Sequence, residues 1–367
     1  MHTAQRPGRQ SGPLGVGGRT AAAYTHGPGK QSGAGRRAGC PVHAIRPWSD
    51  SITVRATQGN PGVVREGAGV VRVWRCRGLR WGGVGVGRGP GLVWEGGRVS
   101  GLGYGQRVAF RVVGERRCPG ARGNRCPVEA RLPGRSTGGL CPECARLDRA
   151  HSVAADTAAG DPRTFRVYLA WFGPGLVKVG ITAEERGGAR LLEQGAVAYT
   201  WLGRGALMAA RRTEELLGTA LGVPDRVPYA VKRLARAGLP EAGERAAEVA
   251  ELYRRAAEVG GWDETLERLP PVVEDHAEVF ALGAVERIDG VVAELVDGGW
   301  LVGRLAAAAG PDLHLEVEGG GAVVLDTRLM VGWGLAGVEE GEEGESGGVA
   351  VPVVRGPGEG EAQGGLF

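Results

Sequence analysis

The chain of 367 residues is poor in lysine, isoleucine, asparagine, phenylalanine and tyrosine, which together account for only 20 residues. A chain biased toward Gly, Ala, Val and Arg is expected to keep its rare residue types where packing or chemistry requires them. Five of the rare residues nevertheless fall within 17 consecutive positions: Phe165, Tyr168, Phe172, Lys178 and Ile181. The stretch 165–196 is therefore the first candidate for a functional site.

Long apolar runs are also missing from the sequence. No window of 18 residues is continuously apolar, and the N-terminus has no apolar core like that of a signal peptide. Six cysteines in a chain of this length favour a reducing compartment, where clustered thiols bind metal more often than they form disulfides. The sequence therefore predicts a cytoplasmic protein without a membrane partner, and it leaves the oligomeric state open.

Charge is unevenly distributed along the chain. Residues 1–70 carry nine Lys or Arg and two acids, and residues 71–160 carry sixteen Arg and six acids. Residues 338–367 carry seven acids and one Arg. The basic front half favours an anionic partner such as DNA or RNA. Residues 1–70 and 338–367 lack sustained hydrophobic periodicity, so we predict a disordered basic tail and a disordered acidic tail.

Residues 71–160 are predicted to be rich in β-structure. The runs 71–76, 92–95 and 107–113 are typical of short antiparallel strands separated by Gly-rich turns. The Gly cluster at 82–91 lacks a complete dinucleotide-binding pattern and is interpreted as a hairpin connection. The aromatic core candidates of this segment are Trp74, Trp81, Trp94 and Phe110.

Four cysteines in this segment have spacing that suits a metal site. They follow the pattern Cys118-x7-Cys126-x14-Cys141-x2-Cys144. Zinc prefers four tetrahedral thiolates, and a Cys-x2-Cys turn supplies two of them from one chain reversal. We therefore predict a structural zinc site, in which His151 could replace one thiolate. Redox-active or unlinked thiols and disulfides are the alternatives, and Cys40 and Cys76 are interpreted as a tail residue and a core residue.

Arginine is concentrated around these cysteines. Residues 107–149 contain ten Arg and four acids, a density that favours contacts with phosphate groups. The arginines predicted to bind nucleic acid flank the first two cysteines: Arg116, Arg117, Arg122 and Arg125.

Residues 161–265 are predicted to form a β-β-α-β-α-α domain. The strands 165–172 and 176–182 are joined by the turn Gly173-Pro174-Gly175, because glycine and proline supply the backbone angles that a tight hairpin needs. Hydrophobic periodicity predicts the elements that follow, which are a helix at 183–194, a strand at 197–203, and helices at 206–222 and 231–237. A longer helix is predicted after residue 240.

Residues 165–222 resemble the GIY-YIG nuclease superfamily in this order and in several motif residues. Val167-Tyr168 matches the end of the first tripeptide motif, and Lys178-Val179-Gly180 matches the second motif, with Lys178 ten positions after Tyr168. Thr182 matches a small polar residue that follows the second motif in some branches. The sequence departs from the superfamily in lacking the second Tyr and a downstream Asn.

The resemblance implies a Mg²⁺-dependent endonuclease or phosphodiesterase. Such a reaction needs a divalent cation on a carboxylate, a group that activates water, and a cation near the developing phosphorane charge. The implied roles are Mg²⁺ binding by Glu214 (or its neighbour Glu215), positioning or activation of water by Tyr168, phosphate stabilisation by Arg190 or Arg186, and added positive charge from Lys178. The alternative is a non-catalytic, zinc-containing module that binds RNA, DNA or protein.

The chain also resembles, over residues 72–335, a bacterial and archaeal family of unknown function. Its members join a cysteine-containing segment to a core of the form VKVGIT…R…R…QGA. The matching residues here are Val177–Thr182, Arg186, Arg190 and Gln194-Gly195-Ala196. Gly195 is interpreted as a helix stop, and Gln194 as a residue that could face a cleft.

Residues 275–337 are predicted to form a small β-barrel. Six short alternating runs with Gly-rich turns between several of them are typical of such barrels, which often bind nucleic acid or another chain. The predicted fold class is therefore α+β with several domains: a zinc-bearing β segment at 71–160, a GIY-YIG-like domain at 161–265, and a barrel at 275–337.

Overall fold

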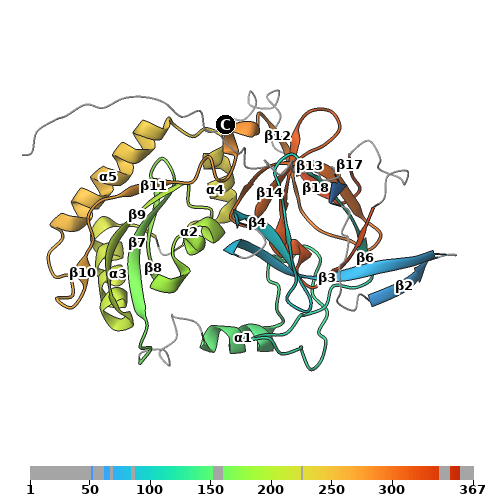
Figure 1. Ribbon diagram of the computed structural model, residues 1–367, viewed down its shortest axis with the longest axis horizontal. Helices are drawn as coiled ribbons and strands as arrows, with labels where there is room; N and C mark the ends of the chain where they lie inside the picture. The colour runs from blue at the N-terminus through green and yellow to red at the C-terminus, as the bar shows by residue number, and fades with distance from the viewer. Residues whose placement is uncertain are drawn as a thin grey trace, which may run out of the picture. The chain divides into compact units, whose positions relative to one another are not determined.

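The computed structural model describes residues 51–52, 62–66, 69–83, 87–151, 160–224, 226–338 and 348–355. All of them belong to one compact unit, Trp48–Phe367, which is a mixed α+β structure built on two β-sheets (Figure 1). Most of the two predicted tails, including Cys40, lies outside the described residues. Four short pieces of the tails instead pair with strands of the larger sheet: β1 (Ser51–Ile52), β2 (Gly62–Glu66), β17 (Gly348–Val349) and β18 (Val353–Arg355).

The larger sheet contains strands from both ends of the described chain. Its hydrogen-bonded order is β18-β12-β15-β14-β13-β6-β16-β3-β4-β5. The runs predicted as strands at 71–76, 92–95 and 107–113 coincide with β3, β4 and β6, which confirms them. The strands not yet defined are β3 (Gly69–Gly83), β4 (Gly87–Trp94), β5 (Val99–Gly101), β6 (Arg107–Val113), β12 (Ile288–Val292), β13 (Trp300–Ala309), β14 (Asp312–Glu316), β15 (Ala322–Asp326) and β16 (Gly334–Gly337).

The prediction of a small barrel made from residues 275–337 alone was wrong for the strands that the structure describes. β6 lies between β13 and β16, and β3 pairs with the other edge of β16. The described path runs from β18 to β5 without a pair that joins its ends. The physical reason is that each C-terminal strand needs a hydrogen-bonding partner at its edge, and sequence alternation does not indicate which strand supplies it.

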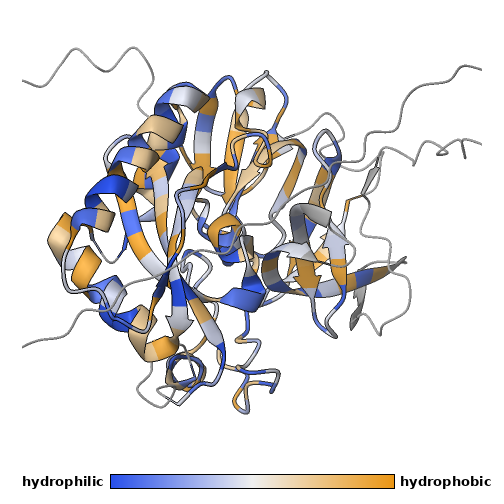
Figure 2. Ribbon diagram, turned by 60° about the vertical axis from the view of Figure 1, so that its left-hand side comes forward, coloured by the Kyte–Doolittle hydropathy of each residue, from blue (hydrophilic) through white to orange (hydrophobic). Residues whose placement is uncertain are grey.

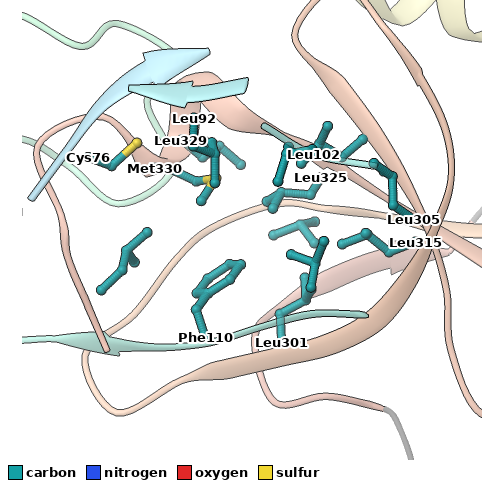
Figure 3. Packing of buried hydrophobic residues seen from close by; sticks show 14 of the residues in the cluster. Cys76, Leu92, Leu102, Phe110, Leu301, Leu305, Leu315, Leu325, Leu329 and Met330 are labelled. Carbon is teal, nitrogen blue, oxygen red and sulfur yellow. The ribbon is translucent and has the colours of Figure 1, made fainter. Parts of the chain in front are cut away.

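The core of the larger sheet contains the aromatic residues that the sequence predicts. Trp74, Trp81, Trp94 and Phe110 are each at most 5% exposed and pack in one cluster with aliphatic side chains from the C-terminal strands. Figure 3 labels neighbours from both sequence segments: Cys76, Leu92, Leu102, Leu301, Leu305, Leu315, Leu325, Leu329 and Met330. Burying this shared apolar surface is what holds the two distant segments together.

The smaller sheet has the order β10-β9-β7-β8, with β11 also paired to β9. The predicted order β-β-α-β-α-α is confirmed by the elements from β7 to α4. Gly175 in the β7–β8 turn has φ of 68°, a left-handed conformation that favours glycine. The elements are β7 (Thr164–Gly173), β8 (Leu176–Ala183), a 3₁₀ turn η2 (Glu184–Arg186), α2 (Ala189–Gln194), β9 (Ala198–Ala206), α3 (Leu207–Leu221), α4 (Tyr229–Arg236), α5 (Ala242–Glu258), β10 (Glu267–Arg268) and β11 (Val273–Asp275).

Helices cover both faces of the smaller sheet. Leu217 of α3 and Leu252 of α5 pack with Leu169 on one face, and Leu191 of α2 packs with Tyr168 on the other. Figure 2 shows the corresponding pattern, with hydrophobic and hydrophilic residues alternating along the helices. Because both faces are buried, β7 is apolar along nearly its whole length instead of alternating.

None of the helices that the structure describes combines the length and the apolar character needed to cross a membrane.

Candidate functional site

The four predicted zinc ligands lie together. Their ligand atoms are all within 4.8 Å of one another, and all four side chains are buried. Cys118 and Cys126 lie in the loop that follows β6, while Cys141 and Cys144 lie at the N-terminus of α1 (Pro142–Ala150). None of the cysteines described by the structure forms a disulfide, and the exposed His151 is not among the clustered ligands.

The geometry of these sulfur atoms fits a tetrahedral metal. Four thiolates at about 2.3 Å from zinc are about 3.8 Å apart, and the Sγ atoms of Cys126 and Cys141 are 3.9 Å apart. The backbone N–H of Cys141 also donates to Sγ of Cys118 at 3.2 Å, which stabilises a thiolate. The apolar cluster around the cysteines adds only Ala121 and the partly buried Ala130, Leu132 and Leu140. So small an apolar core contributes little stability to the loop, and a bound metal ion would add to it.

The pKa values of two of the clustered cysteines, Cys126 and Cys144, shift in opposite directions. The backbone hydrogen bond from Ala130 lowers the pKa of Cys126 to about 7. Burial raises the pKa of Cys144 to about 12, and hydrogen bonds with the neighbouring thiols add to this rise. A bound divalent cation stabilises all four thiolates at once, so the donor set suits a metal such as zinc better than four protonated thiols.

Arg116 differs from its predicted role. It is only 2% exposed, and its guanidinium donates to the carbonyl oxygens of Pro133 and Ser136 at 2.6 Å, of Val331 at 2.8 Å and of Arg328 at 3.0 Å. Burial also lowers its pKa. A guanidinium occupied in this way cannot contact phosphate; it joins the cysteine loop to the larger sheet instead.

The other three predicted arginines remain at the surface. Arg117 lies 2.9 Å from a carboxylate oxygen of Glu115, with its side chain 38% exposed. Arg122 is exposed and has φ of 55°, and the Arg125 side chain is 82% exposed. A cleft of about 210 Å³ bordered by Arg117 and Arg125 lies beside Cys118 and Cys126. The metal loop therefore presents cationic side chains to solvent.

Tyr168 is the centre of the second predicted site. It is 1% exposed, and Nε2 of Gln194 donates a hydrogen bond to its hydroxyl at 2.7 Å. Burial raises the pKa of Tyr168, the positive charge of Arg190 opposes this rise, and the negative charge of Glu214 adds to it. Two other predicted catalytic groups, Arg190 and Glu214, are therefore close enough for their charges to act on the Tyr168 hydroxyl. A buried phenol with a raised pKa keeps its proton, so it is better suited to position another group than to activate water.

The remaining predicted catalytic residues are placed differently. Lys178 is partly buried on β8, and its charge acts on Lys232. Arg186 is exposed and pairs with Glu193 at 2.5 Å, while Arg190 lies 3.6 Å from the same carboxylate. Of the two candidate arginines, Arg190 is therefore the one next to Tyr168.

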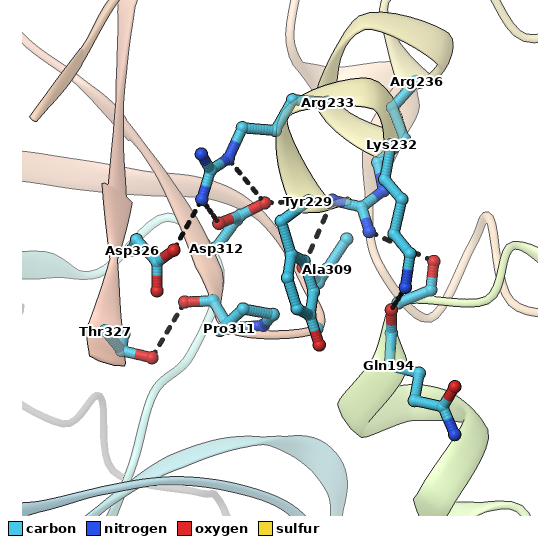
Figure 4. Close-up of polar contacts among 12 residues, drawn as sticks. Gln194, Tyr229, Lys232, Arg233, Arg236, Ala309, Pro311, Asp312, Asp326 and Thr327 are labelled. Atoms are coloured by element: carbon cyan, nitrogen blue, oxygen red, sulfur yellow. Dashed lines mark hydrogen bonds and ion pairs between the residues drawn. The ribbon is translucent and has the colours of Figure 1, made fainter. Parts of the chain in front are cut away.

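Sequence reasoning missed the polar network that surrounds α4 (Figure 4). Arg233 contacts carboxylate oxygens of Asp312 at 2.6 Å and of Asp326 at 2.7 Å, and Arg236 contacts Asp312 at 3.1 Å. Asp312 is fully buried. The network joins α4, next to the smaller sheet, to β14 and β15 of the larger sheet.

Lys232 is the least expected member of this network. It is 4% exposed, donates to the carbonyl oxygen of Gln194 at 3.0 Å, and lies over the rings of Phe172 at 3.7 Å and Tyr229 at 4.5 Å. Burial lowers its pKa to about 7, and the nearby cations Arg236, Lys178 and Arg190 contribute. Lys232 is one of three lysines in the chain. The rarity that identified Lys178 as a candidate functional residue could therefore have identified Lys232 as well.

Comparison with known proteins gives a family but no function. Searches of curated proteins and of solved structures each found no match. The profile of the family described as "Protein of unknown function (DUF2797)" matches residues 105–335, which is more than half of the chain. The matched region includes the four clustered cysteines, the Tyr168 site and α4. The chain therefore belongs to the DUF2797 family.

Proposed function

We propose that this protein binds nucleic acid through arginines displayed by a zinc-stabilised loop. The observation that carries the proposal is the exposure of the side chains in this loop: 82% for Arg125, 75% for Arg131 and 79% for Arg135. All three lie in the sequence between Cys118 and Cys141, two of the clustered cysteines.

The charge and geometry of the loop support this function. Residues 114–149 carry seven arginines besides the buried Arg116, against four acids. Arginine binds phosphate in a bidentate manner. The nearby acids form ion pairs that are largely exposed to solvent, such as Arg131–Glu115 at 2.5 Å. Exposed pairs are weak, so a phosphate group can replace the carboxylate at little cost.

The test is equilibrium binding of the full chain to labelled single-stranded and duplex DNA and RNA, measured by fluorescence anisotropy at several salt concentrations. Binding should weaken steeply with salt, because each neutralised phosphate releases counterions. The triple variant Arg122→Ala/Arg125→Ala/Arg131→Ala should reduce the slope of log K against log[salt] by about 2 to 3.

The matched control is Arg254→Ala, which removes an exposed arginine on α5, away from the metal loop. It should leave both affinity and salt slope unchanged. Affinity that is independent of salt, or equal losses in the control and the triple variant, would contradict the proposal.

A second candidate function is Mg²⁺-dependent phosphodiester hydrolysis. The observation that favours it is that the charges of Arg190 and Glu214 both act on the Tyr168 hydroxyl. In this reaction Glu214 would hold Mg²⁺ and Arg190 would stabilise the phosphate, while Tyr168 would position these groups. Cleavage of mixed DNA and RNA substrates with Mg²⁺ should then be lost in Glu214→Ala and in Arg190→Ala, and retained in Arg254→Ala. Cleavage that survives both changes would exclude this site.

A further inference from the structure

A cleft of about 180 Å³ lies beside Tyr229. Its lining comes from elements far apart in sequence: Leu79 and Trp81 from β3, Pro311 from the turn after β13, Arg328 from the 3₁₀ turn η4 (Thr327–Met330), and Glu193 from α2. The cleft therefore exists only where the two sheets meet α2 and α4.

The cleft has apolar walls and charged groups at its edge. Leu79, Val331 and Pro311 supply aliphatic surface, and the Glu193 carboxylate offers an acceptor. The Arg328 guanidinium donates to Asp326 through Nε and Nη2, which leaves Nη1 as a donor for a ligand. The side chains of Glu193 and Arg328 are 28% and 36% exposed, so both remain within reach of a ligand. A flat molecule with apolar faces and polar edges matches this arrangement.

Tyr229 gives the cleft a rigid boundary. Its ring lies 4.2 Å from the Arg328 guanidinium carbon and 4.5 Å from Nζ of Lys232. Two cations next to one ring restrict its motion. Burial raises the pKa of Tyr229, so its hydroxyl keeps a proton, which it donates to the carbonyl oxygen of Glu193 at 3.4 Å. The hydroxyl oxygen can still accept a hydrogen bond.

Positive charge lies next to Glu193 on α2. The side chains of Arg186 and Arg190 are 45% and 42% exposed, and both pair with the Glu193 carboxylate that lines the cleft. Arg190 is near enough to act on both Tyr229 and Tyr168. The cleft is therefore adjacent to the Tyr168 site, with an arginine between them.

We infer that this cleft binds the base of an unpaired nucleotide, whose phosphate is held by Arg190. An unpaired base has π faces that pack on side chains and polar edges that can pair with groups such as those of Glu193 and Arg328. A base inside a duplex has neither its faces nor its pairing edge available. The inference rests on the proposed nucleic-acid function. It specifies that the bound nucleotide belongs to a single strand or is flipped out of a duplex.

The test uses 5′-ribonucleoside monophosphates, the corresponding nucleosides and inorganic phosphate, titrated into the full chain by isothermal calorimetry. At least one nucleotide should bind about tenfold or more tightly than phosphate. Leu79→Trp, which fills the cleft, should weaken binding of that nucleotide by about tenfold or more. Leu234→Trp makes the same change at a residue that is 78% exposed and does not line the cleft, so it should bind the nucleotide like the wild type. Zinc content and the unfolding midpoint of each variant report whether it is folded.

Arg190→Ala provides a second test that does not alter the apolar lining. It should weaken nucleotide binding about tenfold but leave nucleoside binding unchanged. The inference is overturned if no nucleotide binds more tightly than phosphate, or if a folded Leu79→Trp protein binds nucleotides as the wild type does. Salt-dependent oligonucleotide binding without mononucleotide binding would reject the cleft and keep the proposed function; the reverse result would reject the arginine surface.

Discussion

The ring of Tyr168 lies directly against the backbone of Gly180 on the neighbouring strand. The two residues are register partners in the β7–β8 hairpin. A Cβ at position 180 would lie 2.7 Å from Cε2 of the ring and closer still to Cζ and the hydroxyl oxygen. Glycine is therefore needed here to let the tyrosine lie across β8 and reach Gln194. The motif glycine and the motif tyrosine form a single packing unit.

Replacing Gly180 should destabilise the protein through this contact. Gly180→Ala should lower the free energy of unfolding by about 1–3 kcal/mol, because a methyl group has no room beneath the ring. Gly218→Ala is the matched control, since a Cβ there meets nothing within 4 Å and the position lies inside α3. It should leave the free energy of unfolding unchanged or raise it by at most about 1 kcal/mol. Denaturant unfolding measures both, and equal effects would refute the packing argument.

Metal content should follow the four clustered cysteines. Purified protein should contain about one equivalent of zinc, and Cys126→Ser should lose most of it. A strong chelator should lower the thermal midpoint by on the order of 5 °C or more, because metal binding stabilises the loop. Cys76→Ala, which changes a buried cysteine outside the cluster, should keep its zinc. Less than about half an equivalent in the wild type would count against the site.

Lys232 should make stability depend on pH. Its pKa is lowered to about 7 in the folded protein, against about 10.4 in an unfolded chain. Between these pH values the unfolded state binds more protons, so the free energy of unfolding should rise with pH by up to about 1.4 kcal/mol per unit and level off below pH 7.

Lys232→Met should remove this dependence. The variant should therefore gain stability relative to the wild type near pH 7, and the gain should shrink toward pH 10. Chemical denaturation at several pH values measures the difference in unfolding free energy between the variant and the wild type. The contributions of the other titrating groups cancel in this difference. A difference that stays constant from pH 7 to 10 would show that Lys232 keeps its ordinary pKa.

Asp312 should be essential to the junction around α4. Asp312→Asn leaves Arg233 and Arg236 buried without this carboxylate, and should cost about 3–5 kcal/mol of unfolding free energy. Asp289→Asn is the control, because its pair with Arg287 is exposed and should contribute less than about 1 kcal/mol. Similar losses in both variants, measured by denaturant unfolding, would argue against a special role for the buried network.

Local patterns predicted the parts of the fold that depend on local chemistry. The hairpin around Gly175 followed from turn residues between apolar runs, and the cysteine cluster followed from ligand type and spacing. Tyr168 was identified by its rarity and by motif resemblance, and Arg190 by motif resemblance alone; the structure places their side chains near each other.

Long-range partners could not be predicted in the same way. Val108 pairs with Gly303, and nothing in either local sequence indicates that register. Arg116 and Arg117 are adjacent and chemically identical, yet one is buried among carbonyl oxygens and the other is at the surface. Only tertiary packing separates them. The same holds for Asp312 and Arg233, whose pairing depends on how α4 meets β14.

The interleaving of β6 between β13 and β16 has a consequence for the order in which the chain folds as it is made. β6 leaves the ribosome long before its two neighbours, which begin at Trp300 and Gly334. Until β13 and β16 have been synthesised, β6 cannot pair with them. The segment from β7 to β11, by contrast, contains every strand of the smaller sheet. The central segment can therefore fold during synthesis. The larger sheet is completed only when the last third of the polypeptide has emerged, so its early strands are the part of the nascent chain most in need of protection from aggregation.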